Sequence, residues 1–310
     1  MKWLSDDKLN HLRGVVSEPD FSETKYTFVK ELGRGGMGTV CLVEDRELDR
    51  LVAIKVLNTP EITDDLRDRM IREAQIIARL EHPGIVPVHD VGTLPDGRLF
   101  YAMKYVRGSR LDEYAAQAAT LRDRLRKFQS VCDAVAFAHA HGVIHRDLKP
   151  QNIMIGAFGE VLVLDWGVAK IHDDPRSSPF FPTTEGTVIG TRHYMSPEQA
   201  RGEIDQLDER ADVYSLGAVL YFLLQDQAKV SKGARAIIAK AMADAKENRY
   251  ATASELSADI GRLLDAEPVS AYRENAVERV GRWVSKNRFL VLLVLAYLLM
   301  RFLLIFTSRR

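Results

Sequence analysis

The sequence is poor in cysteine and has no excess of charge of either sign. Its 310 residues include two cysteines, Cys41 and Cys132. A disulfide framework needs more cysteines than this, so a reducing compartment is favoured and both are expected to be small core residues. The 43 lysines and arginines balance 43 aspartates and glutamates. A nucleic-acid-binding protein usually has a strongly basic face, so we expect no nucleic acid among its partners.

The chain also lacks a secretory signal, because residues 1–14 carry charges throughout and no apolar run. It shows no internal repeat and no low-complexity tract. With 46% hydrophobic residues in 310 positions, it is long enough for one large domain or two small ones with a real core. Residues 1–25 are polar and are interpreted as an N-terminal extension.

The hydrophobic pattern changes character near residue 107. Before it, alternation predicts strands at 26–32, 39–46, 51–57, 85–91 and 99–106, with a helix at about 63–80. After it, helices are expected at 121–141, 212–224, 234–243 and 254–264, with short strands at 152–155 and 161–164. A strand-rich half followed by a helix-rich half is typical of an α+β, two-lobed arrangement. We expect the lobes at about 26–106 and 107–265.

A glycine-rich segment, Gly33 to Gly38, joins the first two strands. Glycines let backbone amides approach phosphate oxygens where a Cβ would collide. A plain hairpin with glycines for its turn is an equally good interpretation of this motif alone. A dinucleotide-binding fold needs a helix after the glycines, and here a strand follows.

Charged residues that suit phosphoryl transfer occur in order along the chain. Lys55 lies on the third strand, and Glu73 lies on the next helix, where an ion pair could hold Lys55 against phosphates. A lone lysine on a strand is usually only a solvated charge. Lys55 and Glu73 therefore indicate a phosphate site only together with the polar motifs further along the chain.

The strongest signal is the segment His145-Arg146-Asp147-Leu148-Lys149-Pro150-Gln151-Asn152. In it, Asp147 can accept a hydroxyl proton, Lys149 can neutralise a phosphate, and Asn152 offers an oxygen ligand for magnesium. Asp165, followed by Trp166 and Gly167, is a second oxygen ligand after the next pair of short strands. These residues in this order have few purely structural explanations.

From about Tyr26 to Asp265 the chain resembles the eukaryotic-like (Hanks-type) protein kinases, especially the bacterial membrane-anchored serine/threonine kinases. The glycine loop, the Val-Ala-Ile-Lys strand at 52–55, the His-Arg-Asp loop, the Asp-Trp-Gly triplet and Ser196-Pro197-Glu198 occur in the family's order. The resemblance implies a bilobal protein kinase fold. It also implies transfer of the γ-phosphate of ATP to Ser/Thr hydroxyls of proteins, with Mg²⁺, or Mn²⁺ in its place.

The resemblance also implies roles for individual residues. The expected ATP site comprises Gly33, Arg34, Gly35, Gly36, Met37, Gly38, Val40, Ala53, Lys55, Met103 and Tyr105, with adenine against the hinge at 103–106. The expected catalytic residues are Asp147, Lys149, Lys55 and Glu73, and the expected metal ligands are Asn152 and Asp165. Asp212 is expected to brace the catalytic loop, Glu198 to pair with Arg249, and Thr191 to position substrate.

The segment 171–189 resembles the activation loop and holds the phosphorylation candidates Thr183, Thr184 and Thr187. Arg146 precedes the catalytic aspartate, where a phosphorylated loop can dock. Autophosphorylation is our hypothesis, and an unmodified loop is its alternative.

Three features depart from the family. Trp166 replaces the usual Phe, which should affect loop mobility modestly, and Lys104 stands in the hinge where many relatives carry an acid. After Leu224 the chain is expected to omit a loop and helix of the lower C-lobe, which relatives often use in substrate docking.

Two other function classes compete with an active kinase. A membrane-anchored pseudokinase acting as a nucleotide-binding scaffold is the first, although such proteins commonly lose equivalents of Lys55, Asp147 or Asp165. A small-molecule kinase of the same fold is the second, and the Ser196-Pro197-Glu198 motif argues against it. The resemblance also allows a homodimer, through the N-lobe or the membrane helix.

A long apolar run stands near the C-terminus. Residues 289–306 contain one charge, Arg301, and would span about 27 Å as a helix, close to the bilayer core. We expect a transmembrane helix there, after a basic juxtamembrane linker at 266–288, with the kinase domain cytoplasmic. A partner-binding or buried helix, or a hairpin-like or interfacial one, is the alternative.

Overall fold

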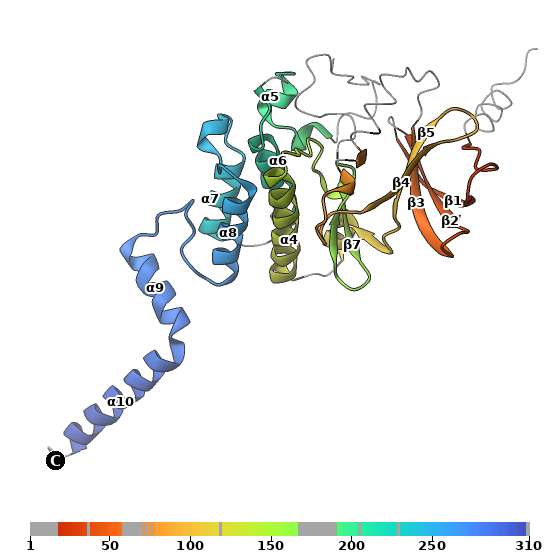
Figure 1. Cartoon of the computed structure of the whole chain (residues 1–310). Helices are drawn as coiled ribbons and strands as arrows, with labels where there is room; N and C mark the ends of the chain where they lie inside the picture. Colours follow the sequence, from red (N-terminus) through yellow and green to blue (C-terminus); the bar gives the residue numbers. More distant parts are fainter. Residues whose placement is uncertain are drawn as a thin grey trace, which may run out of the picture.

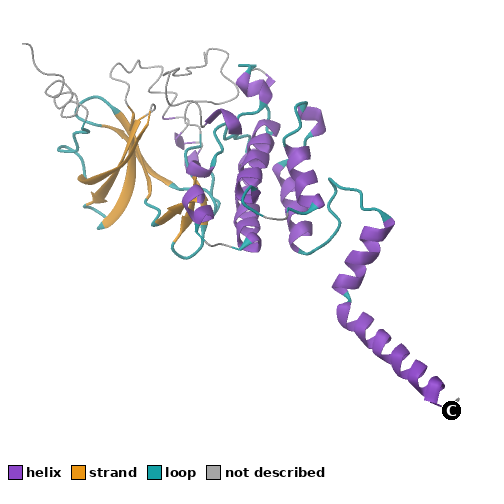
Figure 2. Ribbon diagram, turned by 180° about the vertical axis from the view of Figure 1, so that it is seen from behind, coloured by secondary structure: helices purple, strands orange, loops and turns teal. Residues whose placement is uncertain are grey.

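The structure, a computed structural model, describes residues 18–35, 38–57, 71, 74–75, 77–117, 120–166, 191–203, 206–227 and 230–307. In these residues a β-rich N-lobe and a helical C-lobe lie side by side, and a pair of C-terminal helices extends away from the C-lobe (Figures 1 and 2). The expected α+β, bilobal fold is confirmed. Most of the helix expected at 63–80 lies outside the described residues.

The N-lobe is built on an antiparallel sheet with the strand order β1-β2-β3-β5-β4 in the described part. Its strands are β1 (Tyr26–Gly35), β2 (Gly38–Asp45), β3 (Arg50–Leu57), β4 (Val88–Thr93) and β5 (Leu99–Lys104). Successive residues of β3 face opposite sides, as a strand requires. Val52, Ile54 and Val56 belong to a cluster inside the lobe. Ala53 belongs to a second cluster that joins the sheet to the C-lobe.

Gly38 shows why the turn between β1 and β2 needs a glycine at its end. A Cβ at this position would lie 2.3 Å from the carbonyl oxygen of Val56 on β3. No side chain fits at that distance, so Gly38 lets β2 pack closely on β3.

The C-lobe combines a small sheet with a bundle of helices around one large core. Its strands are β6 (Gly108–Arg110), β7 (Ile153–Gly156) and β8 (Val161–Val163). Its helices are α3 (Leu111–Ala116), α4 (Leu121–Ala140), α5 (Pro197–Ala200), α6 (Arg210–Leu224), α7 (Lys232–Ala241) and α8 (Ala253–Leu264). Helix α6 is apolar on nearly all sides, since Val213, Leu216, Leu220 and Leu223 are fully buried.

The connection between α6 and α7 is short, as the sequence indicates. Helix α6 ends at Leu224, and α7 begins after Ser231, whose hydroxyl accepts a hydrogen bond from the amide of Ala234 at 3.1 Å. Gly217 allows the two helices to pack closely, because a Cβ there would lie 2.7 Å from the Cβ of Ala241. The lobe therefore joins α6 directly to α7.

After α8 the chain is anchored to the C-lobe by the buried carboxylate of Asp259. This carboxylate accepts hydrogen bonds from the amide and hydroxyl of Ser270 at 2.8 and 2.7 Å and from the amide of Ala271 at 3.1 Å. It also accepts from the hydroxyl of Tyr250 at 2.9 Å and the guanidinium of Arg262 at 2.5 Å. Burial raises the pKa of Asp259, but the hydrogen bonds outweigh it and hold the pKa at about 2.

Two helices complete the chain, α9 (Ala276–Lys286) and α10 (Arg288–Thr307). No helix was expected at 266–288, so α9 was missed. Within the residues whose structure is described, no helix has the length and apolar character that crossing a membrane requires. The transmembrane part of the expected fold is therefore not supported, and the side chains of 302–307 lie outside the described residues.

Replacing Asp259 with Ala should lower the free energy of unfolding by about 3 kcal/mol, because buried donors lose a charged acceptor. Asn at this position keeps one acceptor oxygen and should cost less. The pKa of Asp259 is lower in the folded protein than the usual 3.8. Its contribution is therefore complete above about pH 4 and is lost as the pH falls toward 2. Urea unfolding at neutral pH measures the free energy of unfolding of the wild type, the Asn variant and the Ala variant, which should fall in that order. Equal values would contradict the prediction.

Candidate active site

The segment that comes after α4 is held in place by one buried carboxylate on α6. Asp212 accepts hydrogen bonds from the amides of His145 and Arg146, at 2.7 and 2.8 Å. Its Oδ2 also lies 2.8 Å from Nε2 of His139 on α4. Burial raises the pKa of Asp212, and the contacts with His139 and the loop amides outweigh this, so the pKa lies below its usual value. The bracing expected of Asp212 is the arrangement that the structure has.

Arg146 has a backbone φ of 65°, in the left-handed region that residues with a side chain rarely adopt. Two hydrogen bonds hold it there. Its amide donates to Asp212, and its carbonyl accepts from the side chain of Gln199 at 2.5 Å. The strained turn brings the next residue, Asp147, to the surface of the lobe, where its side chain is 37% exposed.

Asp147, Lys149 and Asn152 form one connected group. The ammonium of Lys149 lies 2.8 Å from Oδ2 of Asp147. The side-chain amide of Asn152 donates to the carbonyl oxygen of Asp147 at 2.8 Å and to its Oδ2 at 3.1 Å. Because the NH₂ of Asn152 makes these bonds, its amide oxygen is left as an acceptor or a metal ligand. The structure thus brings together three of the residues that the sequence selected.

His145 links this loop to the strand pair β7–β8. Its Nε2 lies 2.8 Å from the carbonyl oxygen of Leu164, which can only accept, so Nε2 carries the proton. Its Nδ1 then accepts from the amide of Asp147 at 3.3 Å. The ring of Trp166 packs against His145 with centroids 4.9 Å apart. The indole N–H of Trp166 donates to the carbonyl of Val163 at 3.1 Å, so the replacement of Phe leaves no unpaired donor on this ring.

Asp165 lies beside Trp166 and joins the two lobes. Its Oδ1 forms an ion pair and hydrogen bond with the ammonium of Lys55 on β3. The same oxygen accepts a hydrogen bond from the hydroxyl of Tyr101 on β5 at 3.3 Å. Burial raises the pKa of Asp165, but Lys55 outweighs burial, so the pKa lies below its usual value and the carboxylate is charged. Glu73, the expected partner of Lys55, lies outside the described residues.

Tyr101 is a site residue that was not selected from the sequence. The antiparallel register pairs Lys55 directly with Tyr101, so the two side chains leave the sheet on the same face and meet at Asp165. Tyr101 is only 4% exposed, and burial followed by the charge of Asp165 raises its pKa. The sequence does contain a signal for Tyr101: the alternation of β5 places it on the same face as Met103, which was expected to bind ATP.

The apolar residues expected to hold adenine lie in one cluster at the junction of the lobes. Val40, Ala53 and Met103 pack there with Leu162, and Met154 and Leu164 join them from the C-lobe. Met154 and Leu164 were not selected from the sequence, although they lie next to selected residues of the loops. In the glycine-rich segment, Gly33 is surrounded by open space, because a Cβ there would meet nothing within 4 Å. Gly36 and Met37 lie outside the described residues, and Arg34 forms an ion pair with Glu31 at 2.8 Å.

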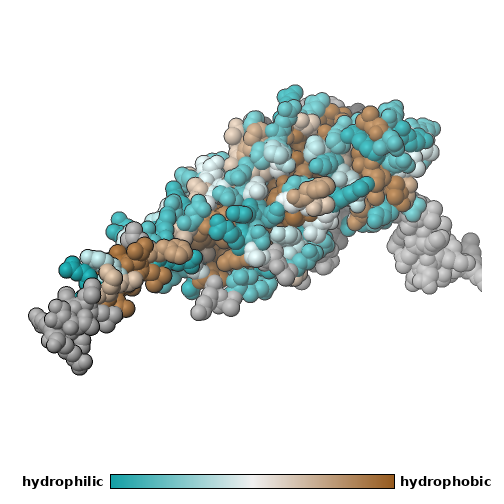
Figure 3. All heavy atoms as spheres, turned by 90° about the horizontal axis from the view of Figure 1, so that it is seen from below, coloured by the Kyte–Doolittle hydropathy of each residue, from teal (hydrophilic) through white to brown (hydrophobic). Residues whose placement is uncertain are grey.

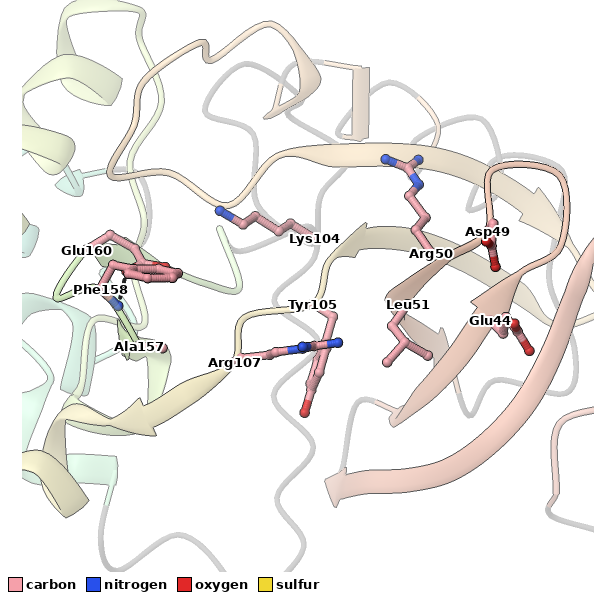
Figure 4. Close-up of a pocket in the computed structure, with 10 residues that line it drawn as sticks. All are labelled: Glu44, Asp49, Arg50, Leu51, Lys104, Tyr105, Arg107, Ala157, Phe158 and Glu160. Carbon is pink, nitrogen blue, oxygen red and sulfur yellow. Dashed lines mark hydrogen bonds between the residues drawn. The ribbon is translucent and has the colours of Figure 1, made fainter.

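A cavity of about 640 Å³ lies on the outer side of the hinge and is lined by polar and apolar residues from both lobes (Figure 4). The side chains of Lys104 and Tyr105 lie there, together with Arg50, Arg107 and Phe158. Strand alternation explains this, because Met103 points to the inner cluster and Lys104 points outward. The unusual hinge lysine therefore lies away from the loop that carries Asp147.

Glu198 and Arg249 form a buried, two-pronged ion pair in the C-lobe, at 2.7 and 2.8 Å. The other donors of Arg249 bond to the carbonyl oxygens of Ala243, Arg210 and Asp244. All five N–H groups of the guanidinium are thus used. Burial raises the pKa of Glu198, and Arg249 more than offsets it, so the pKa lies below its usual value. The phosphorylation candidates Thr183, Thr184 and Thr187 lie outside the described residues, and for Thr191 only the backbone of a 3₁₀ turn is described.

The chain is similar to known proteins in sequence and in fold. A model of the protein kinase domain family matches residues 26–269. The chain is 38% identical over 289 residues to serine/threonine-protein kinase PknB of Mycobacterium tuberculosis, covering 83% of this chain and 45% of that protein. It is 42% identical over 207 residues to serine/threonine-protein kinase pkn3 of Myxococcus xanthus, covering 64% of this chain and 37% of that protein.

Among solved structures, the kinase domain of Mycobacterium tuberculosis PknI is similar, with a TM-score of 0.59 and 27% identity over 77% of this chain and 96% of that one. The chain spans less than half the length of the curated relatives PknB and pkn3.

Replacing Tyr101 with Phe removes one hydrogen bond from Asp165 without changing the ring. Because such a bond contributes about 1 kcal/mol, the affinity for magnesium-bound ATP should fall about fivefold. Titration calorimetry of the variant measures this. Tyr221→Phe, on the 57% exposed ring of α6, is the control and should bind like the wild type. An unchanged affinity in the Tyr101 variant would mean that the hydroxyl does not orient the carboxylate.

Replacing Arg249 with Lys exchanges five fixed donors for a single ammonium and leaves Glu198 poorly paired. We expect a loss of about 3–5 kcal/mol of stability, as for a broken buried pair. Since the folded-state pKa of Glu198 is lowered from 4.5, the stabilisation is present above that pH and is lost as the pH falls below it. Thermal unfolding is measured from neutral to acidic pH. The unfolding temperatures of the wild type and the variant should converge as the pH falls, and a difference that stays constant with pH would contradict this.

Proposed function

The chain belongs to the protein kinase family, and from this premise we propose that it is an ATP-dependent protein serine/threonine kinase. The match to the family model confirms the resemblance found in the motifs. The single observation that carries the proposal is the connected group of Asp147, Lys149 and Asn152, held by Asp212. Together with Lys55 and Asp165, it supplies a residue for each task in phosphoryl transfer.

In this mechanism Asp147 accepts the proton of a Ser or Thr hydroxyl and aims the oxygen at the phosphorus. Lys149, whose ammonium is 2.8 Å from Asp147, neutralises negative charge on the transferring group. Lys55 holds the α- and β-phosphates from the N-lobe side. Since Lys55 would bind phosphates and Asp165 would bind the metal once nucleotide is present, we expect their ion pair to open on nucleotide binding.

The donor set fits magnesium, with manganese as the alternative. Magnesium prefers oxygen ligands and usually binds one or two protein groups together with phosphates and water. The amide oxygen of Asn152 and the carboxylate of Asp165 are such ligands. In the described part of the chain no cluster of three or more His, Cys, Asp or Glu residues could hold a metal alone. Magnesium bound here would neutralise the phosphate oxygens of ATP.

Two finer proposals rest on the sequence. We propose autophosphorylation at Thr183, Thr184 or Thr187, in a loop rich in hydroxyl residues that could dock on Arg146. We also propose that the C-terminal segment attaches the protein to a membrane, with the kinase domain on the cytoplasmic side where ATP is found. The exposed apolar side chains of α10 support this attachment. Mass spectrometry after incubation with ATP tests the first proposal, and unmodified threonines would contradict it.

Deletion of residues 289–310 tests the membrane attachment. The full chain should sediment with the membrane fraction, and the shortened chain should not. A shortened chain that still sediments with membranes would refute the role of this segment.

The kinase activity is tested by transfer of labelled γ-phosphate from ATP to the full chain and to casein, with magnesium present. The Asp147→Asn variant should lose about 10²- to 10⁴-fold of the rate, which is the usual contribution of general-base catalysis. Asp226→Asn, at an exposed position after α6, is the matched control and should retain the rate. A folded wild type that binds ATP but transfers no label would favour the scaffold function instead.

A further inference from the structure

Helix α9 is amphipathic, but its apolar side faces outward. At 100° per residue, Val277, Val280, Trp283 and Val284 fall within an arc of about 120°. In a helix of a globular domain such an arc is normally buried against the core. Here the four side chains are 80%, 61%, 55% and 38% exposed, in chain order.

The polar side of α9 makes the contacts with the rest of the protein. Glu278 pairs with Lys232 of α7 at 2.6 Å and accepts a hydrogen bond from the hydroxyl of Tyr272 at 3.0 Å. Arg282 forms a two-pronged ion pair with Glu274, with distances of 2.8 to 3.0 Å. Asp259 anchors the chain just before these residues. The contacts that the structure describes for the side chains of α9 therefore come from its polar side, and the apolar arc is exposed in the described part of the chain.

The exposed apolar surface continues from α9 into α10. Nine large apolar side chains of α10 are each between 49% and 74% exposed: Phe289, Leu292, Leu293, Val294, Leu295, Tyr297, Leu298, Leu299 and Met300. Figure 3 shows hydrophobic side chains on the C-terminal segment that protrudes from the body of the protein. At 100° per residue, these nine positions of α10 lie all around the helix rather than along one stripe. A second protein or a second copy of this chain covers one side of a helix, whereas lipid surrounds it.

After Glu278, the charges of this segment have a single sign. After Glu278 the sequence contains no acidic residue, and the basic residues are Arg279, Arg282, Lys286, Arg288, Arg301, Arg309 and Arg310. On α9, Arg279, Arg282 and Lys286 fall within an arc of about 60° that adjoins the apolar arc on the side of Trp283. Basic side chains beside an apolar arc suit a surface with apolar depth and negatively charged head groups.

We propose that α9 lies flat in the head-group region of an anionic lipid bilayer, with its apolar arc inserted and with Arg279, the exposed basic residue nearest that arc, at the lipid phosphates. This inference rests on the proposed membrane attachment and goes beyond it, because it gives α9 a separate contact. Trp283 suits this position, since an indole ring prefers the interface between lipid and water. Because the polar side of α9 is tied to the C-lobe, the contact would also fix how the catalytic lobe faces the membrane.

The test uses the full chain with one added cysteine, labelled with a polarity-sensitive fluorophore. Burial raises the pKa of Cys41 to about 11 and also raises that of Cys132, so the native cysteines should not react. The probe replaces Val280 on the apolar arc (V280C) or Lys286 on the basic arc (K286C). Vesicles are made of phosphatidylcholine with or without phosphatidylserine, and binding is measured by flotation.

With phosphatidylserine present, the probe at 280 should brighten at least about twofold and shift to shorter wavelength, as for a group entering lipid, while the probe at 286 should change little. In addition, Arg279→Gln should weaken the salt-sensitive part of the response about fivefold. A chain that floats with vesicles while both probes stay in water would overturn the role of α9 and leave the attachment intact. A chain that does not float would overturn both proposals.

Discussion

A buried carboxylate on the apolar helix α6 is the constraint on which the catalytic geometry depends. A charge in this position would be costly if it were unpaired, but the carboxylate of Asp212 accepts two loop amides and lies beside His139. The amides in turn fix Arg146 in a left-handed conformation that it would not adopt alone. The most hydrophobic helix of the lobe thus determines where the most polar loop presents Asp147.

The second constraint is the register of the N-lobe sheet. Lys55 and Tyr101 meet at Asp165 because β3 and β5 are paired with those two residues opposite each other. A slip of β5 by one residue would turn Tyr101 to the face of the sheet opposite to that of Lys55. The lobes are therefore joined in two ways: by an apolar cluster that tolerates small shifts, and by a polar contact that requires one register.

The parts of the site that are contiguous in sequence could be predicted, and those that depend on distant pairing could not. The loop from His145 to Asn152 carries its chemistry within eight positions, so the motif alone selects its residues. The roles of Asp212 and Arg249 came from the family resemblance, since nothing local marks them. Tyr101 was missed because its partner is 64 residues away and the contact arises only from strand pairing. Helix α9 was missed because its composition is that of a polar linker, while its capping residues and four apolar positions define the helix.

The short connection between α6 and α7 is compatible with a closely packed C-lobe core. The packing of α6 on α7 brings Gly217 close to Ala241, and Leu220 and Ile237 are fully buried in the same core cluster. Near the end of α6, Tyr221 is 57% exposed on a helix that is mostly buried. Asp212 holds the loop through the amides of His145 and Arg146, so the placement of Asp147 depends on α6 itself rather than on the connection that follows it.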